Sequence, residues 1–96
     1  MYKGNSEYVR NATFTVGTSS VTISHPQDRQ LIYLRNSGAT TITIHFGMGS
    51  AEANKGIVLS AGGTYAEANS EGFQTYTGSI NAISDGAGGV LSIVER

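Results

Sequence analysis

The sequence predicts an all-β fold, either a small antiparallel β-sandwich or a jelly-roll-like barrel of about eight short strands. Short runs in which apolar and polar residues alternate recur along the chain, separated by turn residues at intervals of roughly 6–12 residues. No run of about ten or more residues has the period of a helix. Most of the 13 glycines stand between the runs, where turns need their conformational freedom. This spacing is typical of β-sandwiches and small barrels.

The first two runs, residues 12–16 and 20–24, alternate around a Gly17-Thr18-Ser19 turn and predict a hairpin. Ala12, Phe14 and Val16 share one face of the first run.

The best-specified stretch is 29–47, where two β-type runs flank Asn36-Ser37-Gly38 and predict a second, central hairpin. Its first run is apolar on both faces, with Leu31 and Tyr33 on one and Ile32 and Leu34 on the other. Such a strand is usually interior to a sheet or buried at an interface. Its second run, 40–46, alternates and places His45 on the polar face.

A polar loop at 47–56 and further short runs complete the chain. These runs are 57–60, 64–68, 73–77, 78–84 and 90–95.

The chain has 96 residues, which suits one domain and leaves no room for two. Residues 1–11 are polar and without period, so we expect a flexible N-terminal arm followed by a single β domain at 12–96. Tyr2 and Tyr8 give this arm something to bury against a partner.

Composition favours a protein that packs against copies of itself. Charged residues make up 14% of the chain, against a typical share of about 25%, and Ser, Thr, Asn and Gly take their place. The net charge is −1 and the six basic residues are scattered, so we expect neither nucleic acid nor a membrane surface as partner. No secretory signal and no apolar run near the ~20 residues of a membrane span are visible.

The residues indicate no catalysis, cofactor or metal. Gly47-Met48-Gly49 begins like a dinucleotide-binding loop, but Glu52 stands where the third glycine belongs. Cysteine is absent, and His25 and His45 are too far apart in sequence to suggest a metal site. No serine stands in an activating motif. We therefore expect a protein that is not an enzyme.

The chain resembles small virion structural proteins of tailed bacteriophages over residues 31–95. The motifs that carry the resemblance are Leu31-x-x-Leu34-x-Asn36-Ser37, Ile42-x-Ile44-x-Phe46-Gly47, Gly56-Ile57-x-Leu59-x-x-Gly62-Gly63, Gly78-x-Ile80-x-Ala82-Ile83-Ser84 and Leu91-x-x-Val94-Glu95. Such corners often read Leu-x-Pro-Gly, whereas this chain has Ala61-Gly62-Gly63, a less rigid turn. The resemblance implies a module that works by assembly and carries over no catalytic residue.

The expected function is that of a virion structural protein, a homo-oligomeric capsid decoration or head-associated component assembled in the host cytoplasm. We expect a trimer or larger, with the major capsid protein or another virion protein as a further partner. The candidate assembly residues are Tyr2, Tyr8, Leu31, Tyr33 and His45. The alternative is a carbohydrate- or receptor-binding module of a phage fibre, with Tyr65 and Tyr76 presenting their rings on one face.

Overall fold

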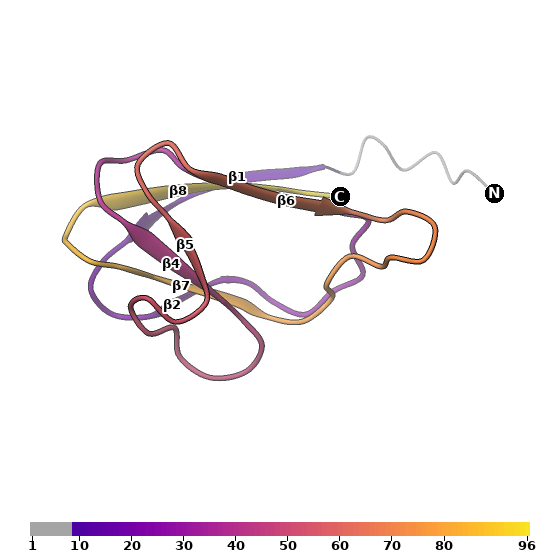
Figure 1. The fold of residues 1–96 in the computed structure, drawn as a ribbon, viewed down its shortest axis with the longest axis horizontal. Coiled ribbons are helices and arrows are strands. Elements are labelled where there is room, and N and C mark those ends of the chain that lie inside the picture. Colours follow the sequence, from indigo (N-terminus) through magenta and orange to yellow (C-terminus); the bar gives the residue numbers. More distant parts are fainter. Residues whose placement is uncertain (1–8) are drawn as a thin grey trace.

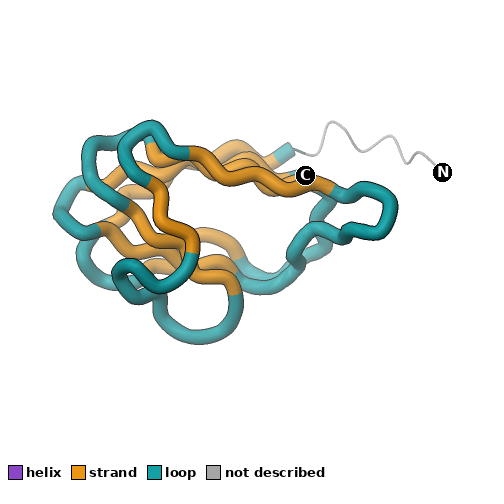
Figure 2. Tube along the Cα trace, viewed as in Figure 1, coloured by secondary structure: helices purple, strands orange, loops and turns teal. Residues whose placement is uncertain are grey.

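The computed structural model describes residues 9–96, which form eight β-strands and no helix (Figures 1 and 2). The all-β prediction is confirmed. The strands are β1 (Arg10–Val16), β2 (Val21–Ser24), β3 (Leu31–Asn36), β4 (Ile42–Phe46), β5 (Ile57–Leu59), β6 (Thr64–Ala68), β7 (Ile80–Ser84) and β8 (Gly89–Glu95).

The strands form two four-stranded antiparallel sheets that face each other. Their orders are β1-β8-β3-β6 and β2-β7-β4-β5. Four nested pairs, β1 with β8, β2 with β7, β3 with β6 and β4 with β5, align the first half of the chain against the second. Two further pairs complete the sheets: β3 with β8 joins two of the nested pairs into one sheet, and β4 with β7 joins the other two into the second sheet. This is the order of a jelly roll, in which one long double-stranded ribbon is rolled into two sheets.

Both predicted hairpins are wrong. β1 and β2 lie in different sheets, and so do β3 and β4. The turns between them carry the chain from one sheet across to the other, and each strand finds its partner in the distant half of the chain. A turn signal in the sequence marks a chain reversal, but it does not say whether the next strand joins the same sheet.

Two boundaries also differ from the sequence prediction. Arg10 and Asn11, which we assigned to the arm, are the first residues of β1 and pair with Glu95 and Val94. Residues 73–77 form no strand. Backbone amides in this segment instead donate to side chains: that of Thr75 to Asn69 and that of Tyr76 to Glu67.

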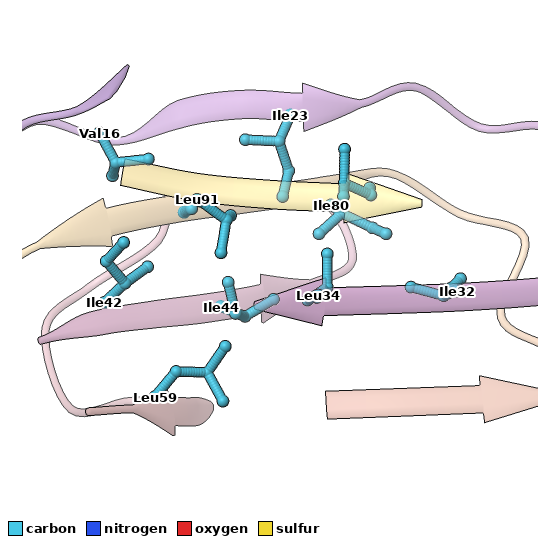
Figure 3. Packing of buried hydrophobic residues seen from close by; sticks show 11 residues of the cluster. Val16, Ile23, Ile32, Leu34, Ile42, Ile44, Leu59, Ile80 and Leu91 are labelled. Atoms are coloured by element: carbon cyan, nitrogen blue, oxygen red, sulfur yellow. The ribbon is translucent and has the colours of Figure 1, made fainter. Parts of the chain in front are cut away.

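The core lies between the two inner sheet faces and is almost entirely aliphatic (Figure 3). Alternation along each strand places these side chains on one face, as the sequence predicts for Ile32 and Leu34 of β3, both fully buried. The buried cluster consists of Val16, Ile23, Ile32, Leu34, Ile42, Ile44, Leu59, Ile80, Ala82, Leu91 and Ile93.

Asn36, at the end of β3, is a fully buried polar residue that holds one end of the sandwich together. Its side-chain amide donates to the carbonyl oxygens of Thr40 at 2.6 Å and Leu59 at 2.9 Å. Its side-chain oxygen accepts from the amide of Gly38 at 3.1 Å, and its backbone bonds to the corner at Gly62 and Gly63. One residue therefore fixes both the β3–β4 crossover and the β5–β6 corner.

The loop at 47–56 covers the outer face of the β2-β7-β4-β5 sheet. Thr43 and Asn81 point outward from this sheet, yet they are only 3% and 8% exposed. The loop bonds to both: the amide of Asn54 donates to the Thr43 hydroxyl, and Asn81 donates to the carbonyl of Gly49. Ala51 is buried in the same contact. The loop therefore covers the part of this face around Thr43 and Asn81, whereas Val58 of β5 remains 44% exposed.

We expect Asn36→Ala to lower the free energy of unfolding by about 1–3 kcal/mol, because it leaves the buried carbonyl of Leu59 without a donor. Urea unfolding measures this change. The matched control is Asn11→Ala, at an exposed position of β1, with an expected change within about 0.5 kcal/mol. Equal effects of the two variants would contradict the role assigned to Asn36.

Candidate functional site

The outer face of the β1-β8-β3-β6 sheet carries a group of neighbouring apolar side chains that are at least partly exposed. Tyr33 of β3 is paired with Val94 of β8 on one side and with Ala66 of β6 on the other. Leu31 is paired with Ala68. All five point outward, opposite to the buried residues of their strands, and all are partly or fully exposed. We call this set the open-face patch.

Polar residues border the open-face patch. Two residues away from Val94, Tyr33 and Ala66 along their strands, a continuous polar row crosses all four strands of the sheet. It consists of Thr13, Ser92, Arg35 and Thr64. An apolar centre with a polar rim is the usual anatomy of a protein–protein interface. The two-faced pattern of residues 31–34 thus has a structural meaning: one face builds the core and the other builds this patch.

A network of buried charges closes the end of the sandwich where β8 finishes. Glu95 continues the inward alternation of Leu91 and Ile93 and is 3% exposed, as is Arg29. The guanidinium Nε of Arg29 donates to one carboxylate oxygen of Glu95 at 2.7 Å. Ser24 donates to the same oxygen at 2.6 Å, and Arg10 of β1 donates to the other at 2.5 Å.

Every N–H donor of Arg29 is used inside the protein. Besides Glu95, the guanidinium bonds to the Ser24 hydroxyl at 2.7 Å and to the carbonyl of His25 at 2.8 Å. Its remaining nitrogen donates to the carbonyls of Tyr76 and Gly78, both at 2.9 Å. These five bonds exhaust the capacity of an arginine side chain. Within the described chain no buried side-chain nitrogen or oxygen lacks a partner.

The environment of Glu95 keeps its carboxylate ionised. Burial by itself would raise the pKa of Glu95, but the hydrogen bonds from Ser24, Arg29 and Arg10 and the charge of Arg29 outweigh it and leave the pKa below its ordinary value. The network is thus a satisfied ionic cluster. Its carboxylate is held by donors on three sides, which suits a structural role better than proton transfer.

A cavity of about 480 Å³ opens beside this network. Nine residues line it, and every one is polar or charged. They come from the segment 27–30, from the β6–β7 loop at Asn69 and Gln74, and from the start of β1 and the end of β8. This is the end of the molecule where the described chain finishes and the β6–β7 loop projects (Figure 1).

Tyr65 and Tyr76, the candidate ligand-binding face, do come together, but as a packed cluster. The ring of Phe46 stacks on Tyr76 at a centroid distance of 4.7 Å and meets Tyr65 edge-on at 5.8 Å. The Tyr76 hydroxyl donates to the carbonyl of Ser79. Phe46 thus covers one ring face of Tyr76, and both tyrosine side chains are partly buried.

The hydroxyl of Tyr65 is also occupied. It donates to the carboxylate of Glu67, and this hydrogen bond, with burial and the charge of Glu67, raises the pKa of Tyr65 to about 12. Tyr65 and Glu67 both lie on the inward side of β6, opposite to the open-face patch.

The candidate assembly residues do not share one surface. Leu31 and Tyr33 lie in the open-face patch, whereas His45 lies on the other sheet, where its ring nitrogen bonds the carbonyl of Met48 at 2.9 Å and anchors the 47–56 loop. Tyr2 and Tyr8 lie outside the described residues.

Sequence reasoning missed the Arg29–Glu95 pair. Glu95 alternates in step with Leu91 and Ile93 along β8, and this pattern could have indicated that its side chain points into the interior. Arg29 follows a turn and has no such signal.

We expect Glu95→Gln to destabilise the fold at neutral pH by about 3–5 kcal/mol, because it leaves Arg29 buried without its counter-charge. In the parent chain Glu95 stabilises the fold above its ordinary pKa of 4.5, and this contribution is lost as the pH falls through the lower pKa of the folded state. The variant should therefore lose less stability than the parent between about pH 5 and pH 2.

Thermal or urea unfolding across that pH range measures the difference. Glu52→Gln is the control, since its ion pair with Lys55 is exposed and should contribute less than about 1 kcal/mol. If the free energy of unfolding of Glu95→Gln and of the parent fell equally with decreasing pH, this would contradict the role assigned to the Glu95 carboxylate.

No group of His, Cys, Asp and Glu side chains within residues 9–96 is arranged to hold a metal ion. In the same part of the chain there is no helix that could span a membrane. Compared with known proteins, the chain matches no protein-family model, no curated protein and no solved structure.

Proposed function

We propose that this protein is a non-enzymatic virion structural protein that acts by self-association through the open-face patch. One observation carries the proposal: the 47–56 loop covers part of the outer face of the β2-β7-β4-β5 sheet, whereas the outer face of the other sheet carries neighbouring, partly exposed apolar side chains across β8, β3 and β6. Leu31, Tyr33 and Val94 are each partly exposed, and a partner that covered them would remove their remaining apolar area from water.

Energetics favour association at this surface. A 96-residue domain buries a modest share of its chain, so its core leaves a thin margin over the entropy lost on folding. Burying the open-face patch against a copy adds apolar burial without new charge, because Arg35 and the polar row remain at the rim. The small charged fraction of the chain also keeps repulsion between copies low.

The fold and the sequence resemblance support the virion setting. Jelly rolls occur in viral capsid domains and in lectins, although a fold alone does not assign a function. The resemblance to small structural proteins of tailed phages points to the first of these. Together they favour a homo-oligomer, a trimer or larger, that decorates the capsid or sits on the head.

The fully bonded ionic network supports a structural role over an enzymatic one. Its carboxylate oxygens and all the N–H groups of Arg29 are consumed by internal bonds. The most buried charges in the described chain therefore have little capacity left for a substrate.

We expect Tyr33→Asp to weaken self-association by at least about 2 kcal/mol, roughly thirtyfold in the association constant, because it places a charge at the centre of the apolar contact. Sedimentation velocity over a concentration series measures this. Val58→Asp is the matched control: Val58 is an apolar residue, 44% exposed, that points outward from β5 of the other sheet.

Equal losses of association in the two variants would contradict the assignment of the interface to the open-face patch. A parent chain that stays monomeric at high concentration would contradict self-association itself.

The virion role is tested separately. Tailed-phage particles purified from the source of this sequence should contain the chain in many copies, as measured by quantitative mass spectrometry of the dissociated particles. If the chain self-associates but is absent from such particles, the virion role is contradicted and only self-association stands.

A further inference from the structure

The polar cavity at the end of the sandwich has the size and the construction of a ligand site. Its volume of about 480 Å³ lies within the range of roughly 300–1,000 Å³ typical of small-molecule pockets. Most such pockets are apolar, and this one is not: among the described residues, none that lines it is aliphatic or aromatic. The carbon stems of these side chains still supply apolar surface, so the lining can also cover the carbon skeleton of a polar ligand.

The polar groups at the floor of the cavity are already hydrogen-bonded within the protein. Arg29 and Glu95 line it and are held by the bonds described above. Since Arg29 uses all its N–H groups internally, it cannot grip a phosphate or a carboxylate in the two-pronged manner usual for arginine. Arg29 and Glu95 thus shape the bottom of the cavity, and the exposed residues around its opening are the ones that can bond to a ligand.

The rim presents hydrogen-bonding groups of both kinds. Asp28, Gln30 and Gln74 line the cavity and are exposed, and they supply one carboxylate and two planar amides. The side-chain oxygen of Asn69 accepts from the amide of Thr75, which leaves the side-chain nitrogen of Asn69 as a further donor. An amide donates and accepts at adjacent atoms, and a carboxylate accepts at two.

We propose that this cavity binds a saccharide. A sugar hydroxyl both donates and accepts, and neighbouring hydroxyls match the paired atoms of amides and carboxylates. A phosphate would meet Arg10 and Arg96 as well as Asp28 and Glu95 in the lining, so the titration below includes inorganic phosphate as the competing ligand.

This site is independent of the proposed assembly surface. The cavity lies at the end of the sandwich, whereas the open-face patch lies on the outside of one sheet. It also differs from the Tyr65–Tyr76 face, whose rings are packed against Phe46. A failure of saccharide binding leaves self-association standing, and a monomeric protein leaves saccharide binding standing.

The test is a titration of the ¹⁵N-labelled full chain with glucose, galactose, N-acetylglucosamine and their oligosaccharides, followed by amide chemical shifts. At least one sugar should give saturable shifts at residues 27–30, 69–74 and 95–96, with a dissociation constant on the order of 1 mM or tighter. Asp28→Ala and Gln74→Ala should each weaken binding about tenfold or more, since both residues are exposed and their loss leaves the Arg29–Glu95 network intact.

Glu71→Ala is the matched control. Glu71 is exposed in the same turn but does not line the cavity, so the variant should bind as the parent does. Three results would overturn the proposal: no saturable shift with any sugar, saturation by inorganic phosphate in place of sugar, or shifts centred on Phe46, Tyr65 and Tyr76.

Discussion

The structure depends on one buried ion pair, that of Arg29 with Glu95. Alternation along β8 directs Glu95 into the interior, where an unpaired carboxylate would be very costly. Arg29 enters from the segment before β3 and supplies the counter-charge, while Ser24 of β2 and Arg10 of β1 bond to the same carboxylate. The pair therefore joins both sheets at the end where the aliphatic core stops.

The consequences of this pair reach beyond its own contacts. Because Arg29 also holds the carbonyls of Tyr76 and Gly78, it positions the segment that enters β7. That segment carries Tyr76 onto Phe46, which fills the space between the sheets. The same pair forms the floor of the polar cavity. At the opposite end Asn36 plays a comparable role with neutral hydrogen bonds. With both ends closed, the open-face patch is a group of neighbouring apolar side chains that stays at least partly exposed on the strands of the described sandwich.

The sequence was informative wherever a pattern was local. Alternation located the strands and put Ile32 and Leu34 in the core and Leu31 and Tyr33 on the opposite face. Alternation could not show which strands pair with each other. In this jelly roll each strand pairs with strands from the other half of the chain, so the two hairpins predicted from neighbouring strands were wrong. It placed His45 outward correctly, but it could not show that the 47–56 loop folds back over that face. Arg29, outside any periodic run, carried no signal of burial.

The most direct test of the central claim is a double-mutant cycle on the buried pair, with Arg29→Met, Glu95→Leu and the double variant compared by urea unfolding. If the pair closes the sandwich, each single variant should lose about 3–5 kcal/mol because it strands the opposite charge, and the double variant should lose clearly less than the sum of the two. Losses that add to within about 0.5 kcal/mol would show that the two residues act separately, and would contradict the claim.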